Sequence, residues 1–346
     1  IWNKDYTLWK DEDREISNRL GWLTSPQDMV SRLPGIEKFA QEIKNEGYTH
    51  ALILGMGGSS LAPEVLSRVF GGIQGRLKLE ILDSTVPAAI LTFKHKLDPR
   101  KTLFIISSKS GTTVETISLF KFFFNWVYES LVKERAGDHF IAITDPGTPL
   151  ELLARQHHFR SIFFGDPEVG GRFSAFSPFD LVPAALTGVE VRKLLEKGQE
   201  MARLCRLSAP LQKNPAAFLG TILTLMAQSG RDKLTFILLP RIESFASWLE
   251  QLLADSTGKE GKGIVPVAGI DDSAPGSYGN DRLFIHVCLE QDKTHYHLIN
   301  ALKKVKHPYL KLNLQDVYSL GGQFFLWEMA TAITGFLLKI NPFDQT

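Results

Sequence analysis

The sequence has little cysteine and no excess of either charge. Cys205 and Cys288 are its two cysteines, so it offers neither a disulfide framework nor a cysteine-based zinc site, as is typical of a reducing compartment such as the cytoplasm. Lys and Arg total 39 against 38 Asp and Glu, without the basic excess of a dedicated nucleic-acid-binding protein. No apolar run approaches the roughly 18 residues of a membrane span. A cytoplasmic protein without nucleic-acid or membrane partners is expected.

The 346 residues are 44% hydrophobic and 22% charged, a composition typical of folded globular proteins. This length predicts about two domains. The chain begins at Ile1 and shows no signal-peptide pattern, so we expect it to be processed or excerpted from a longer protein.

Hydrophobic periodicity predicts an α/β protein. Apolar residues among residues 1–45 recur at helical spacing and predict an N-terminal helical segment. Short apolar runs then alternate with amphipathic stretches, which indicates βαβ units and a buried parallel sheet. The expected strands are residues 50–54, 77–82, 103–107, 140–144 and 161–164, with helices near 60–70, 113–134 and 148–157.

A second α/β stretch follows a helical region that starts near residue 178. Its expected helices are residues 191–207, 215–229, 243–255, 295–304 and 321–339, and its expected strands are 234–239, 264–267, 283–289 and 309–314. Two successive layouts predict two similar domains, residues 1–180 and 181–346. Functional loops should lie at the carboxyl ends of the strands.

The first strand ends in a glycine-rich loop, GMGGSS at residues 55–60. Glycines at a strand-to-helix turn let main-chain amides approach an anion. A dinucleotide fingerprint needs a sixth-position glycine, where this chain has Ser60, although Asp83 after the second strand keeps a nicotinamide cofactor open. A Walker A loop is absent. A simple tight turn explains the pattern equally well.

The third strand runs into SSKSGTTVET, residues 107–116. Hydroxyls and the ammonium of Lys109 at the start of a long helix predict a phosphate cradle. The alternative is a helix cap, for which one such hydroxyl would suffice.

Two later segments carry charged candidates. Arg172 follows two glycines in GGRFSAFSPF and could direct its guanidinium at an oxyanion. Asp255 ends a helix before a Ser-Thr-Gly loop and could carry a proton. Taken alone, each could equally be a solvated surface residue. The histidines, among them His157, His158 and His295, have no companions at metal-ligand spacing.

These motifs, in this order, resemble those of the phosphoglucose isomerase (glucose-6-phosphate isomerase) family. That family carries GxGGS, SKTxTTxET, GGRFS, a helix ending in ESxGK and a late FDQ; this sequence has GMGGSS, SKSGTTVET, GGRFS, ADSTGK and NPFDQ. These segments look similar to those of the isomerase module of bifunctional transaldolase/glucose-6-phosphate isomerases. The resemblance implies two sugar-isomerase (SIS) domains, each a parallel sheet flanked by helices, with the active site between them. It also implies a homodimer, possible fusion to a transaldolase, and no metal or nucleotide cofactor.

The resemblance also implies site residues. The sugar phosphate would be held by Ser59, Ser108, Lys109, Ser110 and Thr113. Gly58 and Arg172 would face the reacting carbons, and Gln251 lies four residues before the carboxylate of Asp255. That carboxylate would move the C2 proton of the open-chain aldose to C1 through a cis-enediolate, whose negative charge Arg172 would stabilise. Glu115 would orient a neighbour.

The chain departs from the family pattern in three places. The family's base is glutamate, whereas this chain has the shorter Asp255. The family's ring-opening histidine aligns with Asp281, which is expected to take its place. A family lysine lies in a segment after FDQ that the given sequence, which stops at Thr346, does not reach.

The predicted function is the interconversion of glucose 6-phosphate and fructose 6-phosphate. One alternative is a non-catalytic SIS module that senses sugar phosphates, and another is a nicotinamide-dependent oxidoreductase using GMGGSS and Asp83. Mannose 6-phosphate shares the same enediol and is a possible further substrate.

Overall fold

The computed structural model describes residues 1–131, 133–206, 210–269 and 275–345. Contacts divide the chain into two units: a five-stranded unit, Gln27–Arg192, and a four-stranded unit made of Ile1–Pro26 and Lys193–Thr346. The sequence predicts a boundary at residue 180, with the first residues in the first domain. The contacts instead divide the chain at Arg192 and group Ile1–Pro26 with the four-stranded unit.

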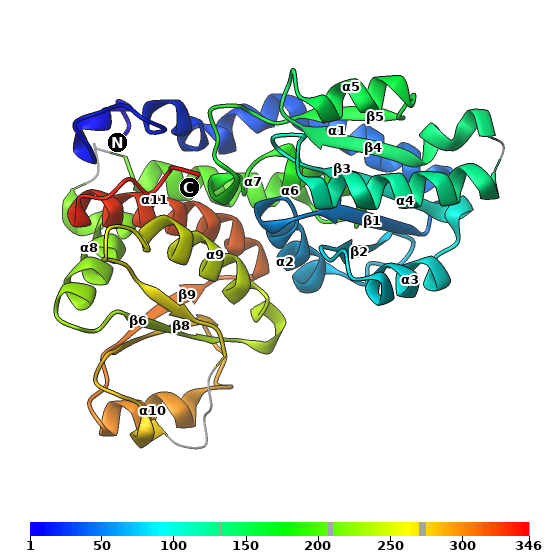
Figure 1. Ribbon diagram of the computed structural model, residues 1–346. Helices are drawn as coiled ribbons and strands as arrows, with labels where there is room; N and C mark the ends of the chain where they lie inside the picture. Colours follow the sequence, from blue (N-terminus) through cyan, green and yellow to red (C-terminus); the bar gives the residue numbers. More distant parts are fainter. Residues whose placement is uncertain (132, 207–209, 270–274, 346) are drawn as a thin grey trace. The chain divides into compact units, whose positions relative to one another are not determined.

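The five-stranded unit contains a wholly parallel sheet with strand order β2-β1-β3-β4-β5 (Figure 1). Each strand lies within one residue of its predicted bounds, which confirms the βαβ interpretation. The strands are β1 (His50–Gly55), β2 (Lys78–Leu82), β3 (Thr102–Ser107), β4 (Phe140–Thr144) and β5 (Ser161–Phe164).

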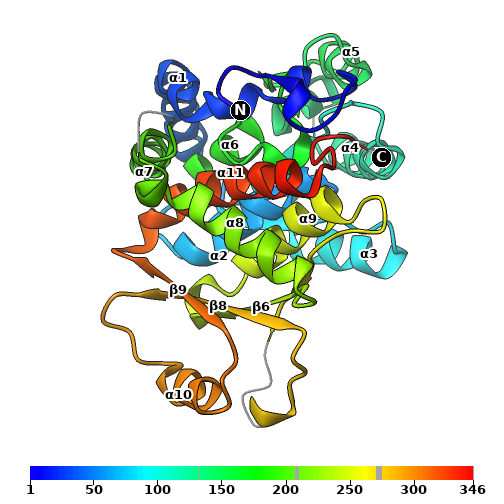
Figure 2. The same cartoon turned by 90° about the vertical axis from the view of Figure 1, so that its left-hand side faces the viewer.

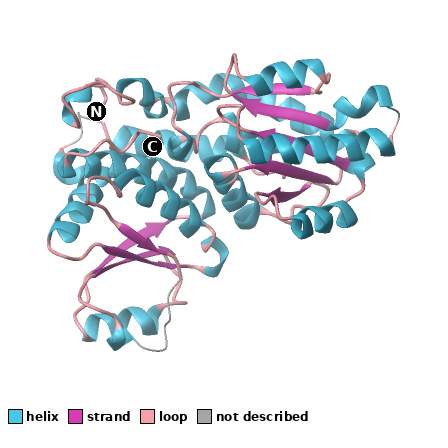
Figure 3. Cartoon of the chain, in the orientation of Figure 1, coloured by secondary structure: helices cyan, strands magenta, loops and turns pink. Residues whose placement is uncertain are grey.

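Helices flank this sheet, as the secondary-structure colouring shows (Figure 3). Alternate residues of the strands, such as Leu52, Phe104 and Phe140, pack with α4 and α5 in one buried cluster, in which the Phe104 and Phe140 rings stack at 4.9 Å. The helices are α1 (Ser25–Asn45), α2 (Leu61–Phe70), α3 (Pro87–Lys96), α4 (Val114–Ser130), α5 (Pro149–Gln156) and α6 (Pro178–Leu186). Helix α3 was not predicted because it has no fully buried residue and therefore no clear apolar stripe.

The four-stranded unit repeats this design with the parallel order β7-β6-β8-β9. In two perpendicular views, α8, α9 and α11 lie on one side of the strands and α10 on the other (Figures 1 and 2). The strands are β6 (Lys233–Leu238), β7 (Val265–Val267), β8 (Arg282–Leu289) and β9 (Tyr309–Leu314). The helices are α7 (Val191–Leu204), α8 (Pro215–Gln228), α9 (Phe245–Thr257), α10 (Tyr296–Lys304) and α11 (Leu320–Leu338).

The predicted helix over the first residues is wrong up to Thr24. That segment contains short 3₁₀ turns, and α1 begins at Ser25. Its apolar residues are anchors rather than a helical stripe: Trp9 donates its indole N–H to the Ala332 carbonyl at 2.9 Å and meets the Phe343 ring edge-on at 4.9 Å. None of the helices in the described part of the chain is long and apolar enough to cross a bilayer.

Candidate active site

The strand order of the five-stranded unit creates a topological switch point between β1 and β3. The chain leaves β1 toward β2 on one side, whereas β3 and β4 lie on the other. In such sheets, ligands bind at the carboxyl ends of the two strands that meet there. The glycine-rich loop follows β1 and the Ser/Thr-rich loop follows β3, so both predicted binding loops lie at this point.

The loop after β3 is organised by hydroxyl groups. Ser108 is buried; its Oγ accepts a hydrogen bond from the Gly111 N–H at 3.2 Å and lies 2.9 Å from Thr113 Oγ1. Ser110 and Thr112 form a second hydroxyl pair at 2.9 Å and are exposed. Gly111 adopts a φ of +67°, and a Cβ there would lie 2.8 Å from the Leu150 nitrogen, so the tight turn requires glycine.

Thr113 occupies the N-cap position of α4 but does not cap the helix. Its side chain makes no capping hydrogen bond, whereas Thr148 and Asn214 cap α5 and α8 through their side-chain oxygens. First-turn N–H groups have no intrahelical acceptor, and a 17-residue helix directs its positive dipole end at this loop. The capping alternative is therefore excluded for Thr113. Glu115 lies exposed in the same first turn.

The ammonium of Lys109 is paired with residues outside its own loop. The Nζ atom lies 2.5 Å from Asp145 Oδ2 and donates to the Asp166 carbonyl oxygen at 2.8 Å. Sequence reasoning missed Asp145, although it directly follows β4 at the same edge of the sheet. That position was the signal that could have identified it.

The glycine-rich loop contacts the segment that carries Arg172. A Cβ on Gly58 would lie 2.5 Å from the Gly171 carbonyl oxygen. The Ser59 carbonyl oxygen also accepts a hydrogen bond at 3.0 Å from the hydroxyl of Ser107, the last residue of β3. Arg172 itself is half-buried. Within this unit the structure therefore brings together three of the loops predicted from sequence.

The nicotinamide alternative gains no support from this loop. The Ser60 hydroxyl, at the position where the fingerprint needs glycine, donates to the Gly57 carbonyl oxygen at 3.0 Å. Asp83 is exposed beyond the end of β2.

The four-stranded unit carries the predicted proton carrier. Gln251 is half-buried and Asp255 exposed, one turn apart on α9. The helix continues past Asp255, and the Gly258 N–H donates to the Ala254 carbonyl oxygen at 2.8 Å. The Thr257 hydroxyl also donates to the Leu253 carbonyl oxygen at 2.7 Å.

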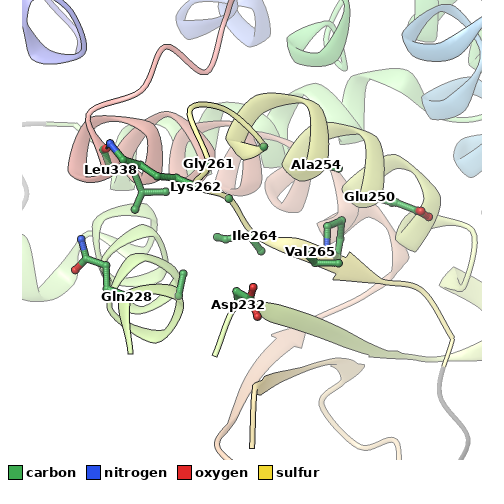
Figure 4. A pocket seen from close by; sticks show the side chains of 13 residues that line it. Gln228, Asp232, Glu250, Ala254, Gly261, Lys262, Ile264, Val265 and Leu338 are labelled. Carbon is green, nitrogen blue, oxygen red and sulfur yellow. The ribbon is translucent and has the colours of Figure 1, made fainter. Parts of the chain in front are cut away.

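A cleft of about 630 Å³ lies on the neighbouring face of the same helix (Figure 4). Glu250 and Ala254 of this helix and its C-cap residue Gly258 line it, together with Asp232 and Lys262. Neither Gln251 nor Asp255 lines this cleft, so its size alone does not identify it as the reaction site.

Asp281 lies at the amino end of β8. Its Oδ2 is 2.8 Å from Lys233 Nζ, and the hydrogen bond from that ammonium holds the pKa of Asp281 below its ordinary value. Asp281 is therefore an ionised carboxylate at neutral pH and has no proton to donate. Sequence reasoning did not foresee this pair, whose Lys233 opens the neighbouring strand.

The second sheet has a loop in the equivalent place, after β8, but with different chemistry. Residues 290–295, EQDKTH, bring two carboxylates and a single hydroxyl. The Nε2 atom of His295 lies 2.9 Å from the Leu238 carbonyl oxygen, and this hydrogen bond requires a protonated Nε2 because a carbonyl only accepts. The anion-binding features therefore lie in the five-stranded unit.

The remaining predicted chemistry concerns histidines and metals. His157 lies against the rings of Phe120 and Phe124, with centroid distances of 5.5 and 4.6 Å. Among the residues that the structure describes, no group of three or more His, Cys, Asp and Glu side chains could hold a metal ion.

Comparisons with known proteins place these features in context. The model of the phosphoglucose isomerase family matches residues 37–270. A glucose-6-phosphate isomerase of Carboxydothermus hydrogenoformans is 28% identical over 392 residues, covering 96% of this chain and 83% of that protein. A hypothetical protein of Thermus thermophilus has a similar crystal structure, with a TM-score of 0.85, 26% identity, and coverage of 95% and 87%. A glucose-6-phosphate isomerase of Chlamydia trachomatis shares the fold, with a TM-score of 0.75, 20% identity, and coverage of 90% and 69%.

Proposed function

The chain belongs to the phosphoglucose isomerase family, and we propose that it interconverts glucose 6-phosphate and fructose 6-phosphate through a cis-enediolate. Membership confirms the resemblance drawn from the ordered motifs. The activity is an aldose–ketose isomerisation of the kind named for the Carboxydothermus relative, and its place is in glycolysis and gluconeogenesis.

The observation that carries the proposal is the start of α4. Its N-cap side chain leaves the first-turn amides uncapped, and the hydroxyls of Ser108, Ser110 and Thr113 surround that end. Main-chain amides, a helix dipole and hydroxyl donors together favour a phosphate dianion. We assign the phosphate of the sugar to these groups, with Ser59 from the adjoining loop.

The proton transfer is assigned to Asp255, with Gln251 as a substrate-binding neighbour on the preceding turn of α9. The carboxylate accepts the C2 proton of the open-chain aldose and returns it to C1, while the hydroxyl proton of O2 passes to O1. The atoms therefore balance without an external oxidant or reductant. Arg172 stabilises the oxyanion that develops as the proton leaves. Gly58, which packs against the Gly171 carbonyl oxygen beside Arg172, is assigned a place facing the reacting carbons.

Two carboxylates retain auxiliary roles in this proposal. Glu115, exposed in the first turn of α4, orients a neighbouring donor. Asp281 occupies the sequence position of the family's ring-opening histidine, but as a carboxylate paired with Lys233 it acts as a proton acceptor rather than a donor. It can therefore accept the anomeric hydroxyl proton, and another group must protonate the ring oxygen.

The family resemblance also supports proposals about the assembly. We propose a homodimer located in the cytoplasm, as part of or related to a chain that also contains a transaldolase. Size-exclusion chromatography with light scattering tests the dimer directly.

A coupled assay with fructose 6-phosphate, run with a chelator present and beside mannose 6-phosphate, tests the activity. The expected result is glucose 6-phosphate formation that the chelator leaves unchanged. Binding of fructose 6-phosphate without turnover would instead support a sugar-phosphate sensor. A fluorescence titration with nicotinamide cofactors distinguishes an isomerase from the oxidoreductase alternative, because only an oxidoreductase should give a saturable binding signal.

A further inference from the structure

The side chain of Lys109 is held by residues outside the loop that carries it. Its ammonium makes a 2.5 Å contact with the Asp145 carboxylate and donates to the Asp166 carbonyl at 2.8 Å. Both side chains of the ion pair are largely buried, with 19% and 13% of their surfaces exposed. An ion pair with this geometry and limited water access is a strong, charge-assisted interaction.

The main chain of Lys109 is held by the same segment. The Asp145 N–H donates to the Lys109 carbonyl oxygen at 3.2 Å, and Thr144 Oγ1 donates to the same oxygen at 3.3 Å. Strands β3 and β4 are parallel, and their pairing ends at Ser107 and Ile143. Residue 145, the first residue after β4, therefore lies beside the loop that follows β3. Asp145 therefore fixes both ends of Lys109.

The pair also changes which groups can attract an anion. A lysine ammonium already in contact with a carboxylate contributes little net positive charge, and an arriving phosphate must compete with that carboxylate. The donors that remain at the loop are uncharged: the hydroxyls of Ser108, Ser110 and Thr113 and the first-turn amides of α4.

Building on the proposed function, we infer that Asp145 is a positioning residue for phosphate binding. It withdraws the Lys109 ammonium from the ligand and uses it to fix the loop, so that the phosphate is bound by uncharged donors held in place. The expected role of Lys109 as a direct ligand thereby becomes an anchoring role.

The test uses Asp145→Asn, Lys109→Met and the double variant. Calorimetry with inorganic phosphate gives Kd, and the fructose 6-phosphate assay gives KM and kcat separately. Each single variant should raise the phosphate Kd and the KM by about tenfold, because the loop that carries the phosphate donors is no longer held in its binding conformation, while kcat changes less than threefold. The double variant should bind phosphate no more weakly than the weaker-binding single variant, because both changes break the same ion pair.

A matched control is Glu46→Gln, which breaks another partly buried ion pair of the same unit, Glu46 with Arg160 at 2.7 Å. Both residues precede strands, β1 and β5, and so lie at the opposite edge of the sheet. This variant should leave the phosphate Kd unchanged, and melting curves should show all variants folded at the assay temperature.

Two results would overturn the inference. Tighter phosphate binding by Asp145→Asn would mean that the freed ammonium binds the anion. Weaker binding by Lys109→Met, with unchanged binding by Asp145→Asn, would make Lys109 a direct ligand. Failure of the proposed function is distinguishable: the wild-type chain would then bind phosphate, with the expected effects on Kd, but show no turnover. A wild-type chain that binds no phosphate would contradict both.

Discussion

The carbonyl oxygen of Gly171 lies 2.5 Å from the point where a Cβ atom of Gly58 would be. One residue belongs to the loop after β1 and the other to the turn that carries Arg172. These two parts of the proposed site are therefore in backbone contact, and no side chain fits at Gly58 unless the Arg172 turn moves.

Substituting Gly58→Ala should disable catalysis without unfolding the protein. Displacing catalytic groups by about 1 Å can cost roughly a hundredfold in rate, and we expect a fall of that order in kcat/KM. Gly171→Ala is the matched control, because a Cβ there meets nothing within 4 Å; its kcat/KM should stay within about threefold of the wild type. Equal losses in both variants would argue against the contact as the cause.

Replacing Ser110 and Thr113 together by alanine tests the phosphate cradle. Each lost hydrogen bond to a charged group is worth about 1.5–3 kcal/mol, so KM for fructose 6-phosphate should rise at least about tenfold. The melting temperature should barely change, since Thr113 does not cap α4.

Asn214→Ala provides the reverse control for this experiment. Asn214 caps α8 by accepting a hydrogen bond from the Ala217 N–H at 3.0 Å, and its loss should cost about 1 kcal/mol of stability without changing KM. Should the Ser110 and Thr113 double variant behave like Asn214→Ala, its hydroxyls serve the fold rather than the ligand.

The parallel sheets could be predicted because their strands are short apolar runs separated by amphipathic helices. The runs that form β3 and β4 are buried along their whole length, and complete burial leaves a continuous apolar signal. The N-terminal segment misled the periodicity argument. Its tryptophans pack singly against distant residues, and Asp5 and Asp13 accept hydrogen bonds from the Thr7 and Ser17 N–H groups, which favours turns over a helix.

The site was predictable where chemistry concentrates in one motif and unpredictable where it depends on tertiary partners. The hydroxyl loop after β3 carries its own signal. Lys109 also stood out, but nothing in the sequence links it to Asp145 across another strand and helix. The same applies to Asp281, whose ionisation is set by Lys233 at the start of a neighbouring strand.

Arg172→Lys should lower turnover more than substrate binding. Lysine keeps a positive charge but loses the planar pair of donors, and a group that acts on transition-state charge affects kcat more than KM. We expect kcat to fall by about two orders of magnitude, measured beside KM and a melting curve. A change confined to KM or to the melting temperature would remove Arg172 from the transition state.

Asp180 should make the protein less stable as the pH rises. It is fully buried on α6, with a long 3.4 Å contact to Ser177 Oγ, and burial raises its pKa well above the ordinary 3.8. The unfolded chain therefore releases this proton at lower pH than the folded chain. The contribution of the protonated Asp180 to the free energy of unfolding is complete below pH 3.8. It declines as the pH rises toward the raised pKa of the folded state, by up to about 1.4 kcal/mol per pH unit.

Urea unfolding of Asp180→Asn from about pH 4 to about pH 8 checks this dependence. An amide does not ionise, so the difference in stability between the variant and the wild type should grow in the variant's favour as the pH rises. Asp11→Asn, at an exposed position, is the control and should run parallel to the wild type. Parallel curves for Asp180→Asn as well would mean that Asp180 does not titrate anomalously.

Asp255 is where the chain departs from the glutamate of its family, and the structure suggests how to test it. The helix extends through Thr257 and ends with a backbone hydrogen bond from the Gly258 N–H to the Ala254 carbonyl oxygen. On a regular helix end, the carboxylate of an aspartate lies one methylene closer to the backbone than that of a glutamate at the same position. Because misplacement by about 1 Å can cost roughly a hundredfold in rate, Asp255→Glu should increase kcat and leave KM nearly unchanged.

Asp255→Asn should abolish exchange of the C2 proton with solvent, since an amide cannot accept that proton at neutral pH. The exchange is followed by NMR in deuterated buffer. If exchange continued at a near-normal rate in Asp255→Asn, the base would be another carboxylate, and Glu115 and Asp281 would be the next to substitute.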